Sequence, residues 1–379
     1  MKICFLTPSL GLHGGTLVMF RYAGHLAARG HEVTIVSPEE PVQCAVPAGI
    51  RFVFHKSKPA RIVFRSCKLV YLFAVARCLR SDFDVVIPTH TPLAVHALFA
   101  RWRYGLDGRV ILLYQDFFAM PWVGRYLRFI LAWKSLVKRL DGVIAVSAGS
   151  AREFQSASGR SPQIIVNGID DLFFTDQQSS KGRYVLFVGR PGKSKGFDVF
   201  ARAMDLVAKR CPDVRGVIIS TEVEDGAIGA IESVRFRDKD QLKKLYSEAL
   251  VYVHAAIGES FGLPPIEAMA AGTAVVLTDT VGTRDYACNN HNCLSVAYGD
   301  SKTMADHIVR LIEDGHLRSR LEAEGRVTAA GFRWQSSLED FEKAITSGSG
   351  RAPETERTER QHSLQKESVR PGGEMGFRS

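Results

Sequence analysis

Short runs of apolar residues alternate with longer amphipathic segments along the first half of the chain. The segment 16–30 has the spacing of a helix, and strands are expected on both sides of it. The expected strands lie at 2–7, 31–37, 84–90, 109–116, 142–147 and 163–170. Strands that are apolar throughout, with helices between them, are typical of a parallel sheet covered on both faces. The pattern therefore predicts a doubly wound α/β domain.

The same alternation starts again after a polar stretch at 175–182. The new series of expected strands lies at 183–189, 215–221, 234–236, 250–256, 274–279 and 293–298. We therefore predict a second doubly wound α/β domain in tandem with the first. In this class of fold the ligand lies outside the carboxyl ends of the strands, so we expect it in a central cleft that both domains face.

The changes of pattern set the predicted domain boundaries. With 379 residues the chain is long enough for two domains. We expect an N-terminal domain at 1–165, an interdomain segment at 166–182, a C-terminal domain at 183–330 and a C-terminal helix at 331–346. The tail at 347–379 has almost no apolar residues. It cannot bury enough surface to offset its chain entropy, and we expect it to be disordered.

The segment 258–272, GESFGLPPIEAMAAG, places two glutamates around a glycine turn and the start of a helix. Gly262 permits a tight turn, and the two prolines after it suit the first turn of a helix. The free N–H groups of a helix start favour an anion such as phosphate, and the carboxylates of Glu259 and Glu267 accept hydrogen bonds from hydroxyls. The combination indicates a ligand with central phosphates and hydroxyl-rich ends. The alternative is an ordinary helix with acidic residues near its N-terminus.

Two further glycine-rich turns follow first strands. The segment 188–198, VGRPGKSKGFD, holds Arg190 and Lys195 between a strand and a helix, a setting that suits phosphate oxygens. The matching turn of the first domain, GLHGGT, contains Gly14 and Gly15. Neither has the spacing of a P-loop or of a dinucleotide fingerprint. Each alone is more often a plain turn, but this interpretation is weaker if the two turns face each other.

Together these segments resemble a retaining glycosyltransferase of the GT-B fold, family 4, also called glycosyl transferases group 1. GESFGLPPIEAMAAGTAVVLTD is similar to the E-x-F-G-x-x-x-x-E block of that family, VGRPGKSKG to its arginine and lysine loop, VNGID to its interdomain segment and GLHGG to its glycine pair. The resemblance covers residues 1–346. It implies two Rossmann-like domains facing a cleft, a nucleoside diphosphate sugar as co-substrate, no cofactor and no metal. It also implies that the helix at 334–345 crosses back onto the first domain.

The resemblance also implies roles for individual residues. The implied donor-binding set is Gly14, Gly15, Arg190, Lys195, Glu259, Phe261, Gly262, Leu263 and Glu267. Arg190 and Lys195 would hold the donor diphosphate and neutralise it as it leaves. Glu259 would hold the transferred sugar together with backbone N–H groups of the turn, and Glu267 would hold the ribose. Arg190, Lys195 and Glu259 would form the catalytic set, working mainly by charge stabilisation and positioning.

The acceptor side departs from the family pattern. Gln115, followed by Asp116, stands where many relatives have a histidine, and His90 ends a neighbouring strand. These three residues are the acceptor-side candidates. Asp285 stands where glutamate is commoner. Two alternatives stay open: a sugar-nucleotide epimerase, which shares the two-domain architecture, and a non-catalytic partner subunit that binds the donor, which Gln115 at the usual histidine position suggests.

Three short motifs imitate metal sites. The sequence DFD ends at Asp84, which begins an expected strand, and DKD starts at Asp238, which has the position of a helix N-cap. The segment CNNHNC offers two cysteines around His291, but it reads as an asparagine-rich turn without a second ligand cluster. No metal ligand set is therefore expected.

Charge and composition bear on partners and location. The chain has 49 basic and 40 acidic residues, a net charge of +9, which attracts anionic partners. The segments 56–80 and 117–140 are basic and aromatic, and such segments either lie on an anionic bilayer or pack as ordinary helices. On the first reading the acceptor is lipid-linked; a glycan acceptor is the other expectation. Seven cysteines without a CxxC pair suit the cytoplasm, with peripheral attachment to the inner membrane face on the first reading. The basic residues do not gather around stacking aromatics, so nucleic-acid binding is not expected.

Overall fold

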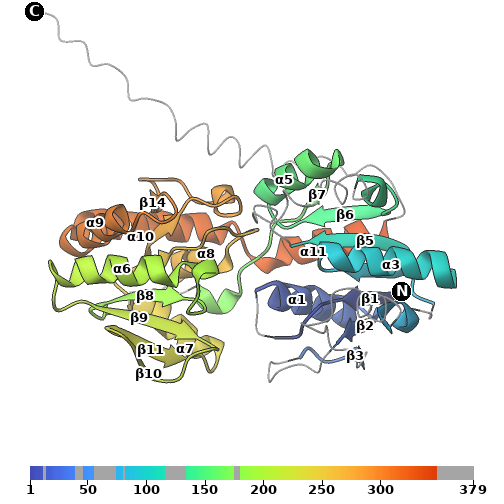
Figure 1. Ribbon diagram of the computed structural model, residues 1–379, viewed down its shortest axis with the longest axis horizontal. Coiled ribbons are helices and arrows are strands. Elements are labelled where there is room, and N and C mark those ends of the chain that lie inside the picture. The colour runs from blue at the N-terminus through green and yellow to red at the C-terminus, as the bar shows by residue number, and fades with distance from the viewer. Residues whose placement is uncertain are drawn as a thin grey trace, which may run out of the picture. The chain divides into compact units, whose positions relative to one another are not determined.

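Two sheets organise the residues that the computed structural model describes (Figure 1). The described residues are 1–11, 14–38, 46–54, 74–79, 82–115, 134–174 and 180–347. The N-terminal sheet has the order β3-β2-β1-β4-β5-β6-β7, and all its strand pairs are parallel. Its strands are β1 (Lys2–Leu6), β2 (Glu32–Ser37), β3 (Ile50–Phe54), β4 (Val85–Pro88), β5 (Arg109–Tyr114), β6 (Gly142–Ala145) and β7 (Gln163–Ile164). The helices between them are α1 (Gly14–Ala28), α3 (Thr91–Tyr104) and α5 (Ala148–Ser158).

The C-terminal sheet has the order β10-β11-β9-β8-β12-β13-β14. Its strands are β8 (Tyr184–Val188), β9 (Arg215–Ser220), β10 (Gly226–Ile228), β11 (Ile231–Arg235), β12 (Val251–His254), β13 (Ala274–Thr278) and β14 (Leu294–Val296). Its helices are α6 (Phe197–Ala208), α7 (Lys239–Glu248), α8 (Leu263–Ala270), α9 (Ser301–Glu313) and α10 (Gly315–Ala330), followed by α11 (Trp334–Thr346). Short 3₁₀ turns are η2 (Asp171–Phe173), η3 (Lys193–Lys195) and η4 (Thr283–Asp285).

Alternating burial along the strands explains why their sequences are apolar throughout. In β1, Ile3 and Phe5 join one apolar cluster, whereas Cys4 and Leu6 join another on the opposite face. Strand β8 repeats this arrangement with Val185 and Phe187 against Tyr184 and Leu186. Helices thus cover both faces of each sheet, and the predicted doubly wound α/β architecture is confirmed.

Two edge strands were not predicted from the sequence. Strand β3 is only half-buried, and the three-residue strand β10 is mostly exposed, so neither has the continuous apolar run of a central strand. Strand β10 also pairs antiparallel with β11. The C-terminal sheet is therefore parallel except at this edge, where a short hairpin ends it.

Helix α11 packs against the N-terminal sheet and its first helix. The ring of Phe341 stacks on Tyr22 of α1 with 3.8 Å between centroids, and it lies 6.3 Å from the ring of Phe5 in β1. The Nε2 atom of His25 lies 2.9 Å from Oε2 of Glu342. The end of the chain's described part is therefore held to its beginning by an aromatic stack and a polar contact.

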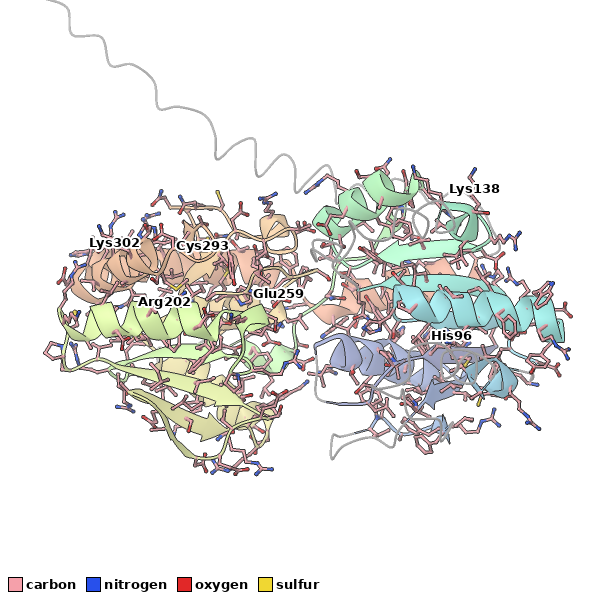
Figure 2. All side chains as sticks on the ribbon, in the orientation of Figure 1. His96, Lys138, Arg202, Glu259, Cys293 and Lys302 are labelled. Atoms are coloured by element: carbon pink, nitrogen blue, oxygen red, sulfur yellow. The ribbon has the colours of Figure 1, made fainter. Side chains whose placement is uncertain are left out.

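Several predicted segments lie outside the described residues. They comprise most of the two basic aromatic segments, positions 175–179 of the interdomain segment and positions 348–379 of the tail. Residues Met1–Ile345 form one compact unit, and the boundaries between the domains within it stay a prediction. Three exposed cations labelled in Figure 2, Lys138, Arg202 and Lys302, lie on separate segments of the chain.

Candidate functional site

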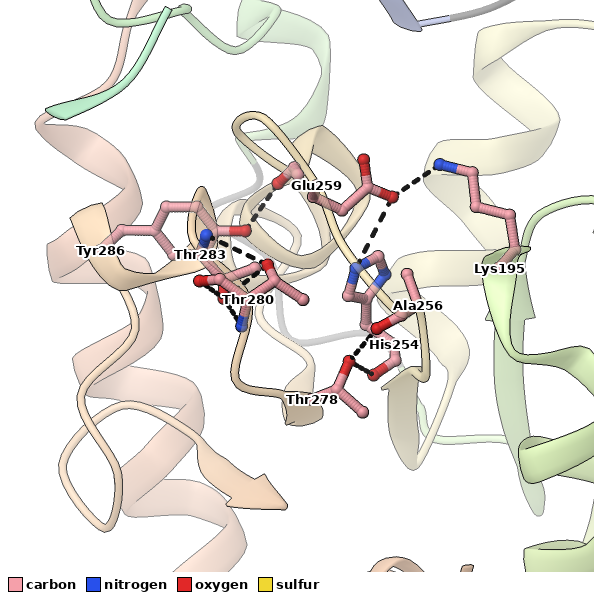
Figure 3. A network of polar contacts seen from close by, with 9 residues as sticks. Lys195, His254, Ala256, Glu259, Thr278, Thr280, Thr283 and Tyr286 are labelled. Carbon is pink, nitrogen blue, oxygen red and sulfur yellow. Dashed lines mark hydrogen bonds and ion pairs between the residues drawn. The ribbon is translucent and has the colours of Figure 1, made fainter. Parts of the chain in front are cut away.

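The turn between β12 and α8 depends on a glycine. Gly262 has a φ of 82°, and its carbonyl oxygen accepts a hydrogen bond of 2.6 Å from the hydroxyl of Tyr286 (Figure 3). A Cβ at this position would lie 3.0 Å from the same hydroxyl, in a backbone conformation that other residues rarely adopt. Helix α8 then begins at Leu263 with a proline in its first turn. The glycine turn and helix start predicted from the sequence are both present.

A second loop meets this turn and brings Lys195 onto Glu259. The Nζ atom of Lys195 lies 2.6 Å from Oε1 of Glu259. Gly196, with a φ of 73°, allows this approach, because a Cβ there would lie 1.9 Å from the carbonyl oxygen of Ala255. The N–H of Ile257 also donates to the carbonyl oxygen of Ser194 at 3.3 Å. Backbone contact between the two loops therefore fixes the ion pair.

A buried histidine lies behind the ion pair. The Nε2 atom of His254, at the end of β12, is 3.8 Å from Oε1 of Glu259 (Figure 3). Burial lowers the pKa of His254 to about 4, so the ring is neutral at physiological pH. Burial alone would raise the pKa of Glu259, but the charge of Lys195 opposes this effect and the pKa is lowered. Glu259 is therefore a carboxylate that stays ionised in a nearly enclosed position.

Glu267 lies on α8 and has the opposite shift. Burial and the charge of Asp170 raise the pKa of Glu267 to about 7, against the effects of Lys239 and of Tyr246. The hydroxyl of Tyr246 donates to Oε2 of Glu267 at 3.2 Å. Asp170 is buried and pairs with Lys239 of α7 and with Arg21 of α1. A hydrogen-bond acceptor that titrates near neutral pH thus lies on the helix that follows the ion pair.

Arg190 lies further from this centre. Its side chain is 49% exposed, and its Nη1 atom lies 3.6 Å from Oε1 of Glu222. Its charge nevertheless contributes to the lowered pKa of Glu259. The structure therefore places Lys195 in direct contact with the carboxylate and Arg190 only within electrostatic reach of it.

The first turn of α1 lies beside the start of α8 and beside the end of β5. A Cβ on Gly14 would lie 3.9 Å from Cδ1 of Leu263, and a Cβ on Gly15 would lie 3.2 Å from Oε1 of Gln115. The start of α1 therefore adjoins the start of α8 and the end of β5. The structure brings these four predicted residues together, and Phe261 is buried next to them in the turn.

The acceptor-side candidates have different surroundings. The backbone oxygen of Gln115 accepts a hydrogen bond of 2.7 Å from the hydroxyl of Ser260, and its buried Nε2 atom has no hydrogen-bond partner among the described residues. His90 precedes α3, and its Nδ1 atom lies 2.9 Å from Oγ1 of Thr89. Asp116 lies outside the described residues. Of the three, only Gln115 is therefore shown next to the turn that precedes α8.

The sequence analysis gave no role to three residues of this region. His254 lies within a predicted strand, and Ser260 and Asp170 form contacts between segments far apart in sequence. Asp285 accepts hydrogen bonds from the N–H groups of Ala148 at 2.6 Å and of the next residue at 3.1 Å, at the start of α5. For His254 the sequence contained a signal. Alternate residues of a strand share a face, so a polar side chain two positions after Tyr252 was expected on the same face as that tyrosine.

The metal-like motifs have structural roles. Asp238 caps α7 by accepting a hydrogen bond of 2.8 Å from the N–H of Gln241, and Asp84 accepts one of 2.7 Å from the N–H of Lys2. The N-cap predicted for Asp238 is confirmed, and Asp84 lies directly before β4 rather than in it. Within the described ranges there is no group of three His, Cys, Asp or Glu side chains that could hold a metal ion. The same ranges contain no helix that is long and apolar enough to cross a bilayer.

Two family models match the two halves of the chain. The model described as Glycosyltransferase Family 4 matches residues 12–171, and the model described as Glycosyl transferases group 1 matches residues 169–328. Together with the sheets and the glutamate and lysine loops, they define the class of the protein. The chain belongs to the group 1, family 4 glycosyltransferases, and the predicted family is confirmed.

The sequences of curated relatives align with nearly the whole chain. It is 31% identical over 360 residues to the phosphatidyl-myo-inositol mannosyltransferase of Mycolicibacterium smegmatis, covering 88% of this chain and 90% of the relative. It is 32% identical to the protein of the same name from Mycobacterium tuberculosis, covering 88% and 93%. It is also 31% identical to the D-inositol 3-phosphate glycosyltransferase of Frankia alni, covering 87% and 93%.

Solved structures show the same fold. The sucrose-phosphate synthase of Thermosynechococcus elongatus is 18% identical and has a TM-score of 0.75. The match covers 90% of this chain and 98% of the other. The Anabaena protein HepE in complex with UDP-glucose is 19% identical, with a TM-score of 0.74 over 92% and 100%. The glycosyltransferase WaaG, involved in lipopolysaccharide biosynthesis, has a TM-score of 0.71 at 17% identity and covers 91% and 100%. The predicted GT-B fold class is confirmed.

Proposed function

We propose that this glycosyltransferase moves a sugar from a nucleoside diphosphate sugar to a lipid-linked or inositol-containing acceptor in glycolipid synthesis, with retention of the anomeric configuration and without a metal ion. The observation that carries the proposal is the ion pair between Lys195 and Glu259 beside the glycine-turned start of α8. The acceptor class rests on the names of the curated relatives. A non-lipid glycan acceptor is the alternative within the same reaction.

The donor is proposed to bind by exchanging the partner of Lys195. The diphosphate oxygens would accept hydrogen bonds from the ammonium of Lys195 and from the N–H groups of the turn at Gly262. Arg190 would add positive charge from the exposed side. Glu259, released from the lysine, would accept hydrogen bonds from hydroxyls of the transferred sugar. Glu267 would accept them from the ribose.

The proposed reaction joins the acceptor oxygen to the anomeric carbon on the face that the diphosphate leaves. The bond from that carbon to the phosphate oxygen breaks, and the diphosphate departs with the electron pair. The acceptor hydroxyl passes its proton to the departing phosphate oxygen. Lys195 stabilises the charge that develops on the leaving group, which is the largest electrostatic contribution expected of a side chain here.

Gln115 is the side chain that we propose for the acceptor side. Its buried amide nitrogen lies at the end of β5 without a hydrogen-bond partner among the described residues, so it can donate to a bound hydroxyl. His90 is retained as a second acceptor-side candidate because it follows the neighbouring strand β4. Asp116 stays a candidate on sequence grounds alone.

Turnover with defined substrates tests the function. The protein is incubated with UDP-glucose, UDP-N-acetylglucosamine or GDP-mannose, with phosphatidylinositol or inositol phosphate as the acceptor, and the product is examined by NMR. We expect an α-linked product from an α-linked donor, one nucleoside diphosphate released per transfer and unchanged activity with EDTA. Replacement of the exposed cation Lys302, Lys302→Ala, is the control and leaves turnover intact.

Other outcomes identify the alternatives. An inverted anomeric centre would overturn retention, and loss of activity with EDTA would overturn metal independence. A sugar-nucleotide isomer without free nucleoside diphosphate would show an epimerase. Donor binding without turnover across a full acceptor panel would indicate a non-catalytic partner subunit. This alternative is suggested by Gln115, which stands where many relatives have a histidine.

The proposed location is the cytoplasmic face of a membrane. The net charge of +9 favours contact with anionic lipids, and an acceptor anchored in the bilayer would be reached from its surface. Sedimentation with vesicles of phosphatidylglycerol and phosphatidylcholine tests this. Binding should weaken as salt rises from about 0.05 to 0.5 M, because screening shortens the electrostatic range. Equal partition into purely neutral vesicles would argue against the proposal.

A further inference from the structure

His254 is a buried polar side chain to which the family pattern gives no role. It ends β12 and is only 3% exposed. The next turn of chain is held in place by Thr278 of β13, whose hydroxyl donates to the carbonyl oxygen of Ala256 at 2.7 Å (Figure 3). The backbone on the C-terminal side of the histidine is therefore fixed, and its ring has little freedom to leave the space behind Glu259.

The ring nitrogen of His254 and the ammonium of Lys195 approach the same carboxylate oxygen. Oε1 of Glu259 lies 2.6 Å from Nζ of Lys195 and 3.8 Å from Nε2 of His254. The second distance is too long for a hydrogen bond, and Nε2 is buried without a hydrogen-bond partner among the described residues. A buried nitrogen without a partner is costly, so the arrangement favours a second state in which this nitrogen is satisfied.

We propose that His254 is a positioning residue that donates a hydrogen bond from Nε2 to Glu259 when Lys195 leaves that carboxylate for an anionic ligand. The inference rests on the proposed function, in which the ligand is the diphosphate of the donor. A small rotation of the Glu259 side chain toward the ring closes the gap that the structure shows. The other carboxylate oxygen then faces the sugar.

The proposed hydrogen bond solves a problem that donor binding creates. Removal of Lys195 from Glu259 leaves a nearly buried carboxylate without its cation, and burial then favours the protonated form. A neutral imidazole that donates from Nε2 stabilises the ionised form without adding a charge that would attract the diphosphate away from Lys195. The carboxylate thereby remains a strong acceptor for sugar hydroxyls.

A ligand-free measurement tests the exchange directly. The variant Lys195→Met removes the ammonium and keeps an apolar stem, so Glu259 should turn to the histidine. In ¹H–¹⁵N spectra at neutral pH we expect the Nε2–H signal of His254 to move downfield in this variant, as a proton does on entering a hydrogen bond to a carboxylate. Lys302→Ala is the matched control and leaves the signal in place. An unchanged signal in Lys195→Met, or a proton on Nδ1, would overturn the inference.

Calorimetry with and without the sugar tests the role in binding. The probes are UDP and GDP against UDP-glucose, UDP-N-acetylglucosamine and GDP-mannose. His254→Leu keeps the volume but has no donor, and His254→Gln places an amide N–H near the position of Nε2. We expect His254→Leu to bind the free diphosphates like the wild type and to lose about 10-fold or more in affinity for the sugar-bearing donor. His254→Gln should recover most of that loss.

The outcomes separate this inference from the proposed function. Equal weakening of the diphosphates and the sugar donors in both variants would mean that His254 is only structural, and the inference would be wrong. If the wild type binds none of the sugar nucleotides, the proposed function is wrong. The spectral change in Lys195→Met would then still decide whether His254 is the alternative partner of Glu259.

Discussion

Glu259 and Glu267 stand on either side of the start of α8, and their carboxyl groups behave in opposite ways. Burial raises the pKa of both groups. Lys195 reverses this effect at Glu259, whose pKa is lowered, whereas Asp170 adds to it at Glu267, whose pKa reaches about 7. The comparison shows that one short segment can hold a permanent carboxylate and a titrating one, because the partners come from elsewhere in the chain. Four predictions test this contrast.

Replacement of Lys195 should have the largest effect. Lys195→Ala removes the cation proposed to face the leaving diphosphate, and we expect turnover to fall about 100-fold or more. The pKa of Glu259 should rise, because burial is no longer opposed by that charge. Steady-state rates with the best donor check the first point, and NMR titration of the carboxyl carbon checks the second. Full activity would refute the assigned role.

The second-largest effect is expected at Gly196, because this glycine allows the loop with Lys195 to approach the loop with Glu259. Gly196→Ala adds a Cβ that would lie 1.9 Å from the carbonyl oxygen of Ala255, at a φ of 73°. We expect a loss of about 2 to 4 kcal/mol in the free energy of unfolding, measured by urea denaturation. Gly192→Ala is the control, because Gly192 has an extended backbone and free space around the added atom. A neutral effect at Gly196 would mean that the loops do not touch.

The titration of Glu267 should appear in the stability profile. Its pKa is higher in the folded protein than in the unfolded chain, so the folded state binds more protons between about pH 4.5 and 7. Stability from this group is present below pH 4.5 and is lost as pH rises to 7. Glu267→Gln should remove that loss and gain about 1 to 3 kcal/mol over the wild type at pH 8 relative to pH 5. If the free energies of unfolding of the wild type and Glu267→Gln, measured with urea, change in parallel with pH, the raised pKa of Glu267 is wrong.

The smallest effect is expected from Lys239, which lowers the pKa of Glu267 through its charge. Lys239→Met should move the stability transition of the previous experiment to higher pH. Lys244→Met, an exposed position on the same helix, is the matched control and should leave the midpoint unchanged. A downward movement in Lys239→Met would show that the lysine acts mainly by anchoring Asp170, with which it pairs.

Local patterns in the sequence were enough to predict the architecture and the glycine turn before α8. The apolar runs predicted the central strands because those residues are buried on both faces. The glycine and prolines predicted the start of α8 because few other residues allow that backbone. Strands β3 and β10 escaped prediction because they are edge strands with exposed residues.

Contacts between distant segments could not be predicted in the same way. The pairing of Asp170 with Arg21 and Lys239 joins three segments, and nothing in their local sequence specifies it. The position of His254 behind Glu259 likewise depends on how the loop after β12 folds back. Arg190 was expected to act together with Lys195, but it pairs with Glu222 instead. The position of an exposed cation is decided by nearby charges that the sequence does not locate.

On the proposed function, the contact between Lys195 and Glu259 would make ligand binding selective before any chemistry begins. A simple anion such as chloride or inorganic phosphate must compete with an internal carboxylate for the lysine, and it offers Glu259 little or nothing in return. A molecule that supplies both a polyanion and adjacent hydroxyls compensates both side chains at once. If Lys195 and Glu259 bind the donor as proposed, this internal ion pair would therefore disfavour abundant small anions and favour ligands that carry both groups side by side.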